Sequence, residues 1–520
     1  MINGTIEALI AVTLVGSFVV MASSDRVAPK LATVWSLLPL AGSLYMWANF
    51  DGEKNALLSD GVLAFESQVN WLSLGPLPDI QWYVGVDGIS MPLVVLTGVL
   101  TTLALVSSWT PIDERQSQFY GLVLFLEAGL LGVFTALDFF VWFVFWEAVL
   151  LPMYFLIGVW GGPRRKYAAI KMFVYTNVAS LVMFIGFAAL VFGLGVDSFG
   201  LPAVTEASLG ANPAADTSFG FSVGALKAAA FFAMFAGFAV KVPVVPVHTW
   251  LPDAHVEAPT PVSVLLAGVL LKMGTYALLR FNFTMLPEVA NANAPIIAAF
   301  AVISIIYGAM LALAQSDLKR IVAYSSVSSM GYVILGLVAY TLYGVGGATF
   351  QMISHGLISG LMFMAVGVIY NTTHTRMVTD MSGMADKMPY TVAIFIAGAF
   401  GYMGLPLMSG FAAEFYVFLG SMQAKWGANF GDIHVLFTAV GMFGIVVVAG
   451  YLLFAMQRTL FGEFRLDTDY EVGEAPLHDV APLAVLLVMI IALGTAPDIF
   501  FEMIRDASGP VADLISGGGA

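Results

Sequence analysis

The chain consists largely of apolar runs about 20 residues long, the length that an α-helix needs to cross about 30 Å of hydrocarbon. Only 10% of the 520 residues are charged, 59% are hydrophobic and the mean hydropathy is +0.90. A soluble chain of this size could not cover such a core with polar surface. Because apolar and polar residues do not alternate with period two, the pattern predicts an all-α polytopic membrane protein rather than a β-barrel.

The apolar runs predict fourteen transmembrane helices in a single membrane domain, 1–520. The predicted spans are 2–22, 29–49, 89–109, 119–136, 138–160, 167–195, 222–245, 259–281, 294–314, 319–339, 343–370, 391–420, 432–461 and 479–504. The first run lacks a basic segment before its apolar core, so we interpret it as a retained span rather than a signal peptide. An even number of spans places both termini on one side of the membrane.

Spans seven and twelve are predicted to be broken helices, at 238–246 and 401–410. Proline removes a backbone donor and glycine tolerates unusual torsions, so such breaks need protein or water to satisfy the freed backbone groups. The breaks are five spans apart and each falls fourth in a five-span unit. The sequence therefore predicts two inverted repeats, 119–281 (spans four to eight) and 294–461 (spans nine to thirteen), an arrangement typical of transporters. Residues 1–118 supply spans one to three and an outside loop, and 479–520 the last span and tail.

Lysine and arginine are distributed unequally between the two sets of alternate loops. One set holds Arg26, Lys30, Arg115, Arg164, Arg165, Lys166, Lys319, Arg320, Arg376, Lys387, Arg458 and Arg465; the other, with the termini, holds Lys54, Arg280, Lys425 and Arg505. Basic loops stay in the cytoplasm. We therefore expect a multi-pass protein of the bacterial inner membrane with both termini on the periplasmic side. The net charge of −14 does not indicate a nucleic-acid partner.

Glu147, Lys241, Lys272 and Glu414 lie inside the predicted spans and are the candidate ion-path residues. A charge at membrane depth is costly and usually faces a partner or a wet cavity. Two alternatives stay open: Glu147 could be permanently protonated, and Lys241, near its helix end, could extend to the membrane surface. Lys272 is too deep to do so.

Histidine titrates near neutral pH and can shuttle protons, which makes His248 and His355 candidate secondary members of the path. A metal site of His248, Asp253 and His255 is a rival interpretation, although a loop capping a broken helix explains these residues without metal. Asp138, Lys171 and Lys227 lie near span ends, so solvated or interfacial roles are expected for them. The absence of cysteine excludes thiolate-bound iron–sulfur clusters in this chain.

Several motifs resemble those of the antiporter-like subunits of complex I, the proton-pumping NADH:quinone oxidoreductase. The motifs are Phe145-Trp-Glu-Ala148, Phe238-Ala-Val-Lys-Val-Pro243, His248-Thr-Trp-Leu-Pro-Asp-Ala-His255, Leu270-Leu-Lys-Met273, Asp317-Leu-Lys-Arg-Ile-Val-Ala-Tyr-Ser-Ser326 and His355-Gly-Leu357. The superfamily also contains subunits of multisubunit Na⁺/H⁺ antiporters. Glu414, where related subunits usually have lysine, makes the chain most similar to the M-subunit family.

The resemblance implies a proton relay: Glu147 and Lys241 as the charge pair of the inner half-channel, Lys272 as the central relay and Glu414 as the terminal site, with His248 and His355 on the same hydrated axis. Arg376 and Lys319 match basic positions near the cytoplasmic surface. Two departures are Ser329, where the family often has histidine, and Leu407-Met408, where Gly-Thr is common.

The predicted function is therefore a proton-translocating subunit without cofactor or metal, in which no redox chemistry takes place. The resemblance implies that NAD, FMN, iron–sulfur clusters and quinone are bound by other subunits, and that the partners are membrane lipid and other membrane subunits, including the L and N antiporter-like subunits, rather than a second copy. Two rivals stay open: a cation/proton antiporter subunit, and a structural spacer whose charges only hold helices together.

Overall fold

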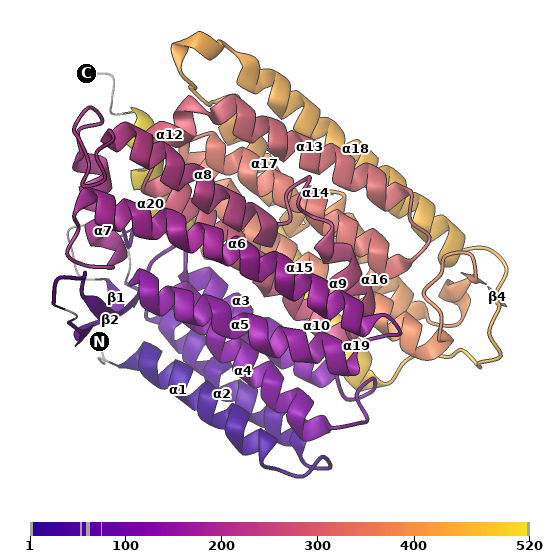
Figure 1. Cartoon of the computed structure of the whole chain (residues 1–520). Coiled ribbons are helices and arrows are strands. Elements are labelled where there is room, and N and C mark those ends of the chain that lie inside the picture. The colour runs from indigo at the N-terminus through magenta and orange to yellow at the C-terminus, as the bar shows by residue number, and fades with distance from the viewer. Residues whose placement is uncertain (1–3, 52–54, 59–62, 74, 517–520) are drawn as a thin grey trace.

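The computed structural model describes residues 4–51, 55–58, 63–73 and 75–516; Lys54, one of the basic residues counted above, lies outside them. The chain is mostly helical, and its long helices lie side by side between two ends of the molecule (Figure 1). The long helices are α1 (Thr5–Met21), α2 (Ala28–Ala48), α3 (Met91–Ser107), α4 (Gln116–Thr135), α5 (Phe139–Trp160), α6 (Arg165–Leu194), α8 (Val223–Lys241), α13 (Ala294–Leu313), α14 (Leu318–Val338), α15 (Leu342–Thr373), α16 (Pro389–Tyr402), α17 (Ser409–Met422), α18 (Ile433–Thr459), α19 (Leu477–Thr495) and α20 (Asp498–Ser516).

The remaining helical segments are short. They are α7 (Leu201–Gly210), α9 (Trp250–Glu257), α10 (Thr260–Leu265), η1 (Leu266–Leu270), α11 (Leu271–Ala277), η2 (Leu278–Thr284), α12 (Pro287–Ala292), η3 (Met384–Asp386) and η4 (Ala428–Phe430). The segments from α10 to η2 follow one another without interruption and form one span, Thr260–Thr284, that is buried along its whole length. Within that span, η1 and η2 are π-helical turns.

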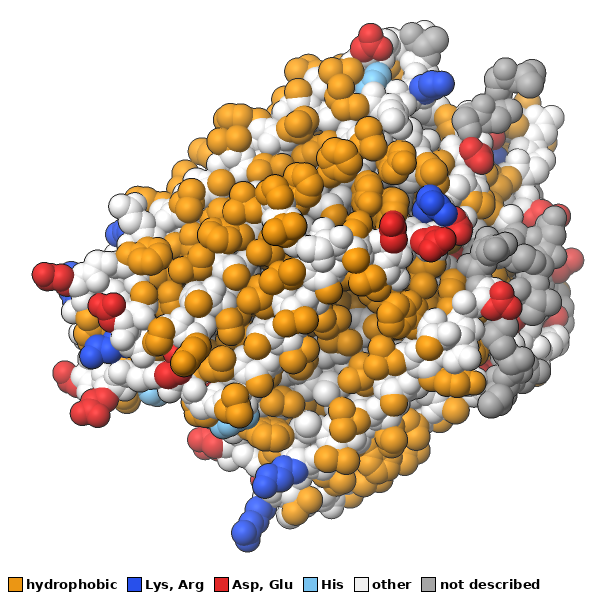
Figure 2. Space-filling model, turned by 180° about the vertical axis from the view of Figure 1, so that it is seen from behind, with side chains coloured by type: hydrophobic (Ala, Val, Ile, Leu, Met, Phe, Trp, Pro, Cys, Tyr) orange, Lys and Arg blue, Asp and Glu red, His pale blue; other side chains and the backbone are white. Residues whose placement is uncertain are grey.

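Among the described residues, eleven helices are long and apolar enough to cross a membrane. Three further apolar helices, α1, α3 and α16, are shorter. Apolar side chains cover most of the face shown in Figure 2, with the charged residues gathered mainly toward the ends. The prediction of a polytopic helical membrane protein is confirmed, whereas the count of fourteen spans stays a prediction.

The two ends of the bundle differ, and we name them by their contents. The hairpin face holds the antiparallel hairpin of β1 (Ala64–Leu72) and β2 (Ile80–Val86), together with α7 and α20, at the left of Figure 1. The basic face, at the right, holds the short antiparallel pair of β3 (Met381–Ser382) and β4 (Arg465–Leu466). The description of the fold as all-α therefore needs correction, because each end carries a small two-stranded sheet.

The predicted last span, 479–504, is also wrong at its end. Helix α19 stops at Thr495, and α20 begins as a separate helix at Asp498. The apolar residues of α20 that the span prediction had included, Phe500, Phe501 and Ile504, are buried against the protein. They follow the spacing of an amphipathic helix that packs on the bundle rather than continuing α19.

Both predicted helix breaks are present, and the helices that lead into them run in opposite directions. Helix α8 runs from the hairpin face to Lys241, and α9 follows beyond residues 242–249. Helix α16 runs from the basic face to Tyr402, and α17 follows beyond residues 403–408 (Figure 1). The first break contains two prolines, Pro243 and Pro246. In the second break, Gly404 and Leu407 adopt positive φ angles of 62° and 74°.

Helices α5 and α14 start at opposite ends of the bundle, and each has an aspartate as its N-cap. Asp138 accepts hydrogen bonds from the backbone of Phe140 and Val141, and Asp317 accepts them from Lys319 and Arg320. Such caps satisfy backbone donors that a helix start leaves unpaired. The expectation of a solvated role is wrong for Asp138, which is buried and also accepts from the backbone of Gln81 in the hairpin.

A buried ion pair connects the hairpin face to the central span. Arg280 in η2 lies 2.6 Å from the carboxylate of Asp87, which also accepts backbone hydrogen bonds from Ala56 and Ser90. Burial alone would raise the pKa of the Asp87 carboxyl, but the charge of Arg280 and these hydrogen bonds outweigh burial and lower that pKa below its ordinary value.

We expect Asp87→Asn to lower the free energy of unfolding by about 3–5 kcal/mol, because it leaves the buried Arg280 charge unpaired. Since the folded-state pKa of Asp87 is lowered, the stabilisation is present above its unfolded pKa of about 3.9 and is lost as the pH falls through the folded value. Thermal unfolding in detergent over an acidic pH series measures both effects. Asp197→Asn, at an exposed site on the same face, is the control; equal unfolding temperatures for the two variants would contradict the assignment.

Candidate functional site

Lys241 is buried at the end of α8, directly before the first break, and the partly buried Glu147 lies in α5. Lys241 is 4% exposed, and its ammonium lies 4.9 Å from the ring centroid of Trp146, the residue before Glu147. The Glu147 carboxylate acts electrostatically on Lys241, but no ion pair within 4.0 Å between them is found among the described residues. The tryptophan face supplies a cation–π contact. Lys241 is therefore held near Glu147 without contact, and it does not extend to the protein surface.

The Glu147 carboxylate is only weakly hydrogen-bonded. One oxygen accepts from the side-chain amide of Asn177 at 3.4 Å, and the other is buried with no partner in the described part of the chain. The unpaired oxygen can accept a hydrogen bond from a group that moves toward it.

Lys272 forms the tightest polar contact in the interior. It is fully buried in α11, donates to the carbonyl of Ala267 and lies 2.6 Å from Nδ1 of His355 in α15. The Ala267 carbonyl belongs to the π-helical turn η1, and π-turns of this kind occur often at functional sites. The other imidazole nitrogen of His355 has no partner among the described residues, and the ring lies 5.9 Å from that of Tyr402.

Glu414 lies in α17, buried beside the second break. Its Oε2 has no hydrogen-bond partner in the described structure, and a side chain at Gly404 would collide with it. The charge of Glu414 acts on the hydroxyls of Tyr332 and Tyr451, and Tyr451 donates to Ser325 at 2.6 Å. The second break therefore places a carboxylate next to a group of buried hydroxyls.

The structure brings some of the predicted residues together and separates others. A Cβ at Gly274 would lie 3.2 Å from the Cβ of Lys241, so the helix of Lys272 packs on the end of α8. Glu414 belongs to the other half of the chain. The His248 ring packs 5.9 Å from Tyr307 in α13, so it does not join the Lys272–His355 pair.

Cations from helices α6 and α14 and from the loop after α15 hold α9 on the basic face. Asp253 pairs with Lys171 at 2.7 Å and with Arg320 at 2.8 Å. Lys319 donates to the carbonyl of Ala258, and Arg376 donates to the carbonyl of Val256. Positive charge at a helix C-terminus satisfies carbonyls and complements the helix dipole.

The residues of the rival metal site face different partners. Asp253 is engaged by two cations, His255 stacks on Phe363 at 4.4 Å, and His248 faces Tyr307. No group of three or more His, Cys, Asp or Glu that could hold a metal is found in the described ranges. Of the solvated or interfacial role expected for Lys227, the solvated alternative is wrong, because the residue is buried; it pairs at 3.4 Å with Glu288, which is exposed.

Sequence reasoning missed Glu127 in α4. It is fully buried, and neither carboxylate oxygen has a hydrogen-bond partner among the described residues. Glu127 lies inside the predicted span 119–136, so the criterion that selected Glu147 would also have selected it. The pairing of Asp87 with Arg280 was missed as well, because no local pattern relates residues so far apart.

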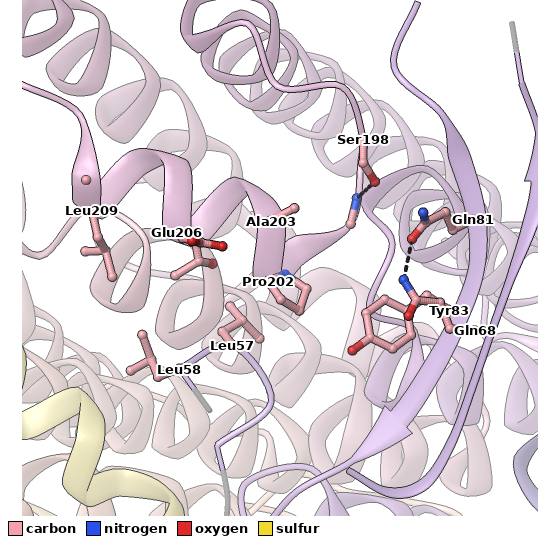
Figure 3. Close-up of a pocket in the computed structure, with 13 residues that line it drawn as sticks. Leu57, Leu58, Gln68, Gln81, Tyr83, Ser198, Pro202, Ala203, Glu206 and Leu209 are labelled. Atoms are coloured by element: carbon pink, nitrogen blue, oxygen red, sulfur yellow. Dashed lines mark hydrogen bonds between the residues drawn. The ribbon is translucent and has the colours of Figure 1, made fainter. Parts of the chain in front are cut away.

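A surface cavity of about 630 Å³ opens on the hairpin face, away from these residues. Figure 3 shows Pro202, Ala203, Glu206 and Leu209 of α7 on one side and residues of the hairpin on the other. Gln68 and Gln81 close it with a hydrogen bond of 2.8 Å. None of the candidate path residues lines this cavity.

These features define a class: a helical membrane protein with paired helix breaks and a series of buried ionisable residues between its two ends. The family model described as "NADH:quinone oxidoreductase/Mrp antiporter, TM" matches residues 136–443, and the chain belongs to that family.

Relatives and solved structures agree with this assignment. The chain is 41% identical over 451 residues to NAD(P)H-quinone oxidoreductase chain 4 1 of Synechococcus elongatus, covering 87% of this chain and 80% of the relative. It is 37% identical to F(420)H(2) dehydrogenase subunit M of Methanosarcina mazei over 95% of both chains. The fold matches a chain of respiratory complex I from Thermus thermophilus, with a TM-score of 0.85, 24% identity and 98% and 99% coverage. It also matches a chain of the Mrp complex from Dietzia sp., with a TM-score of 0.82, 20% identity and 99% and 98% coverage.

We expect Gly404→Ala to destabilise the second break. The residue has a φ of 62°, which costs a non-glycine residue about 1–2 kcal/mol, and its new methyl group would meet the Glu414 carboxylate. Thermal unfolding in detergent should therefore show a lower midpoint. Gly450→Ala is the matched control, because it lies in helix α18 with no atom within 4 Å of its added Cβ. An unchanged midpoint for Gly404→Ala would show that the break accommodates a side chain there.

Proposed function

We propose that this chain is a proton-translocating membrane subunit of an NADH:quinone oxidoreductase-type complex, driven by quinone reduction in other subunits. The observation that carries the proposal is the series of ionisable groups associated with the two breaks: the partly buried Glu147 with the buried Lys241, then Lys272 and His355, then Glu414. Buried ionisable residues in a membrane bundle mark ion paths. The names of the two relatives, chain 4 of a quinone oxidoreductase and subunit M of a dehydrogenase, support the same assignment.

The contact between Lys272 and His355 suggests how a proton crosses the middle of the bundle. The ammonium of Lys272 can donate to Nδ1 of His355, and a proton can leave from the opposite nitrogen. Imidazole has two nitrogens on opposite sides, so it can pass a proton from one helix toward another. Because Tyr402 lies on the path from His355 toward the second break, its hydroxyl is a candidate next step, with Glu414 as the terminal acceptor.

The first break supplies the switch. Lys241 and Glu147 interact without contact, and Coulomb attraction grows as charges approach, so a movement of α8 toward or away from Glu147 strengthens or weakens their interaction. Moving one charge against 100 mV costs about 2.3 kcal/mol, and a change of two pKa units supplies about 2.7 kcal/mol. A switched pair of this kind therefore operates at the required energy scale.

The finer topology is part of the proposal: fourteen spans, with 119–281 and 294–461 as inverted repeats. The matched aspartate caps support it, since Asp138 forms a β-bridge with Gly200 before the first broken helix and Asp317 forms one with Met377 before the second. These two sites lie at opposite ends of the bundle, as inversion requires. The basic face is then cytoplasmic, with both termini in the periplasm of the bacterial cell.

The assembly is also proposed. The chain works as one copy beside the L and N antiporter-like subunits, while NAD, FMN, iron–sulfur clusters and quinone bind elsewhere. Support comes from the fold matches to chains of respiratory complex I and of the Mrp complex, both of which are assemblies.

A cation/proton antiporter subunit is the second candidate, favoured by the fold match to the Mrp complex. Glu414 and the relatives' names favour the first. Purification in mild detergent through a tag on this chain, followed by mass spectrometry, separates the two. We expect flavin-binding and iron–sulfur subunits to co-purify, whereas a set of only small membrane subunits would reverse the order of the candidates.

We expect Lys241→Ala and Glu147→Ala to lower quinone reduction coupled to proton pumping at least about tenfold, because each removes one partner of the switched pair. Assembly and NADH oxidation with an artificial electron acceptor should be unchanged. Coupled activity is measured as pH-dye quenching in membrane vesicles.

Lys425→Ala and Glu471→Ala are the controls, since both residues are exposed. Full coupled activity in the Lys241 variant would overturn its assigned role. Failure to assemble would instead support the structural-spacer interpretation.

A further inference from the structure

The outward face of α6 changes from basic to apolar along its length. Residues 164, 167, 171, 175, 178 and 182 recur at spacings of three and four, so they lie on one side of the helix. The row begins with Arg164, at the N-cap, and ends with Val182, 18 residues or five turns later. Helix α6 lies at the front of the molecule in Figure 1, with α8 beside it.

The basic end of this face forms a surface cavity of about 560 Å³, lined by residues 162–167. Arg164, Arg165 and Lys166 are all exposed, and the described lining includes no carboxylate. The nearby carboxylate of Glu257, in α9, contacts this loop from inside the protein: Glu257 is buried and accepts a hydrogen bond from the backbone of Arg164. Three cations therefore face outward at the membrane surface.

Their contacts leave these cations available. The Arg164 guanidinium lies 5.0 Å from the Tyr167 ring, and Arg165 donates to the carbonyl of Gly161 at 3.2 Å. Neither contact neutralises charge. Positive charge clustered at the end of a membrane helix attracts anionic headgroups.

An apolar groove of about 410 Å³ continues on the same side of α6. Its lining residues are Val174, Tyr175, Val178, Ala179, Val182, Ala236, Gly237, Val240 and Val247. At 1.5 Å per residue, it extends from about 12 Å to about 24 Å below Lys166. One leaflet, with its headgroup layer, is about 20–22 Å thick. The groove therefore begins where the acyl chain of a lipid with its phosphate at Arg164–Lys166 would lie.

We propose that this face of α6 binds one anionic phospholipid, with its phosphate at Arg164, Arg165 and Lys166 and an acyl chain in the groove. Charge complementarity selects the occupant, because a purely apolar helix from a neighbouring subunit would leave three cations unmatched. The inference goes beyond the proposed function and does not depend on proton movement.

The bound chain would also contact the first helix break. Val240 and Val247 of the groove flank residues 242–246, which follow Lys241. From the same side of α6, Lys171 donates to the carbonyl of Thr249 and the Tyr175 hydroxyl lies 3.3 Å from the Thr249 hydroxyl. An acyl chain in the groove therefore extends a set of contacts that already holds the break.

The test is native mass spectrometry of the intact complex, purified in mild detergent from membranes that contain phosphatidylglycerol. We expect the triple variant Arg164→Gln, Arg165→Gln, Lys166→Gln to lower the bound phosphatidylglycerol at least fivefold relative to the wild type. The control variant Arg26→Gln, Lys30→Gln, Arg458→Gln removes three exposed charges of the same set of loops and should retain the lipid. Equal retention in both variants overturns the proposal.

A second variant tests the groove without changing charge. Val178→Trp fills it and should also lower lipid retention, whereas Ile303→Trp, at an exposed apolar site on α13, should not. Loss of a protein subunit from the triple variant, with bound lipid unchanged, would identify the face as a subunit interface and overturn the lipid assignment. Neither readout depends on pumping, so the proposed function can fail while this inference stands.

Discussion

The contact between Lys272 and His355 is the constraint on which the interior depends. An ammonium in an apolar bundle is tolerated only if the protein supplies its partners. Here one partner is a carbonyl in the π-turn η1 and the other is an imidazole from α15. The contact therefore joins the two halves of the chain at the level of the breaks.

The break after Lys241 depends on a second set of contacts. Residues 242–249 have lost regular helical bonding, so their position follows from the segments on either side. Helix α9 is tied to α6 through Lys171 and to α14 through Arg320, and both cations meet on Asp253. Because these anchors come from both halves, a movement of α14 relative to α6 would be transmitted to the break and to the separation of Lys241 from Glu147.

The sequence predicted the interior better than the ends of the bundle. Lys272 and Glu414 are costly at membrane depth wherever they point, so their burial followed from hydropathy alone, whereas Glu147 is only partly buried. Asp138 was misassigned because a buried helix cap and a solvated residue can both lie at the end of a span. Only the hairpin that packs over Asp138 makes it buried. Glu127 was overlooked although it lies inside a predicted span, as Glu147 does. The distance between Lys241 and Glu147 depends on how α8 ends and packs, which no local pattern encodes.

The two breaks differ in how they are held, and the difference suggests unequal roles. The first is exposed only in part, at Pro246 and Thr249, and leads into a segment fixed by four cations. The second has no comparable ionic anchor among the described residues, and its Leu407 is 63% exposed with a φ of 74°. A leucine in that conformation is strained and cannot gain from burial within this chain, so whatever covers it, lipid or a neighbouring subunit, also sets the geometry beside Glu414. The adaptable second break therefore places the candidate residue Glu414 next to the chain's surroundings, whereas the candidate residue Lys241 lies next to a break that is anchored from within the chain.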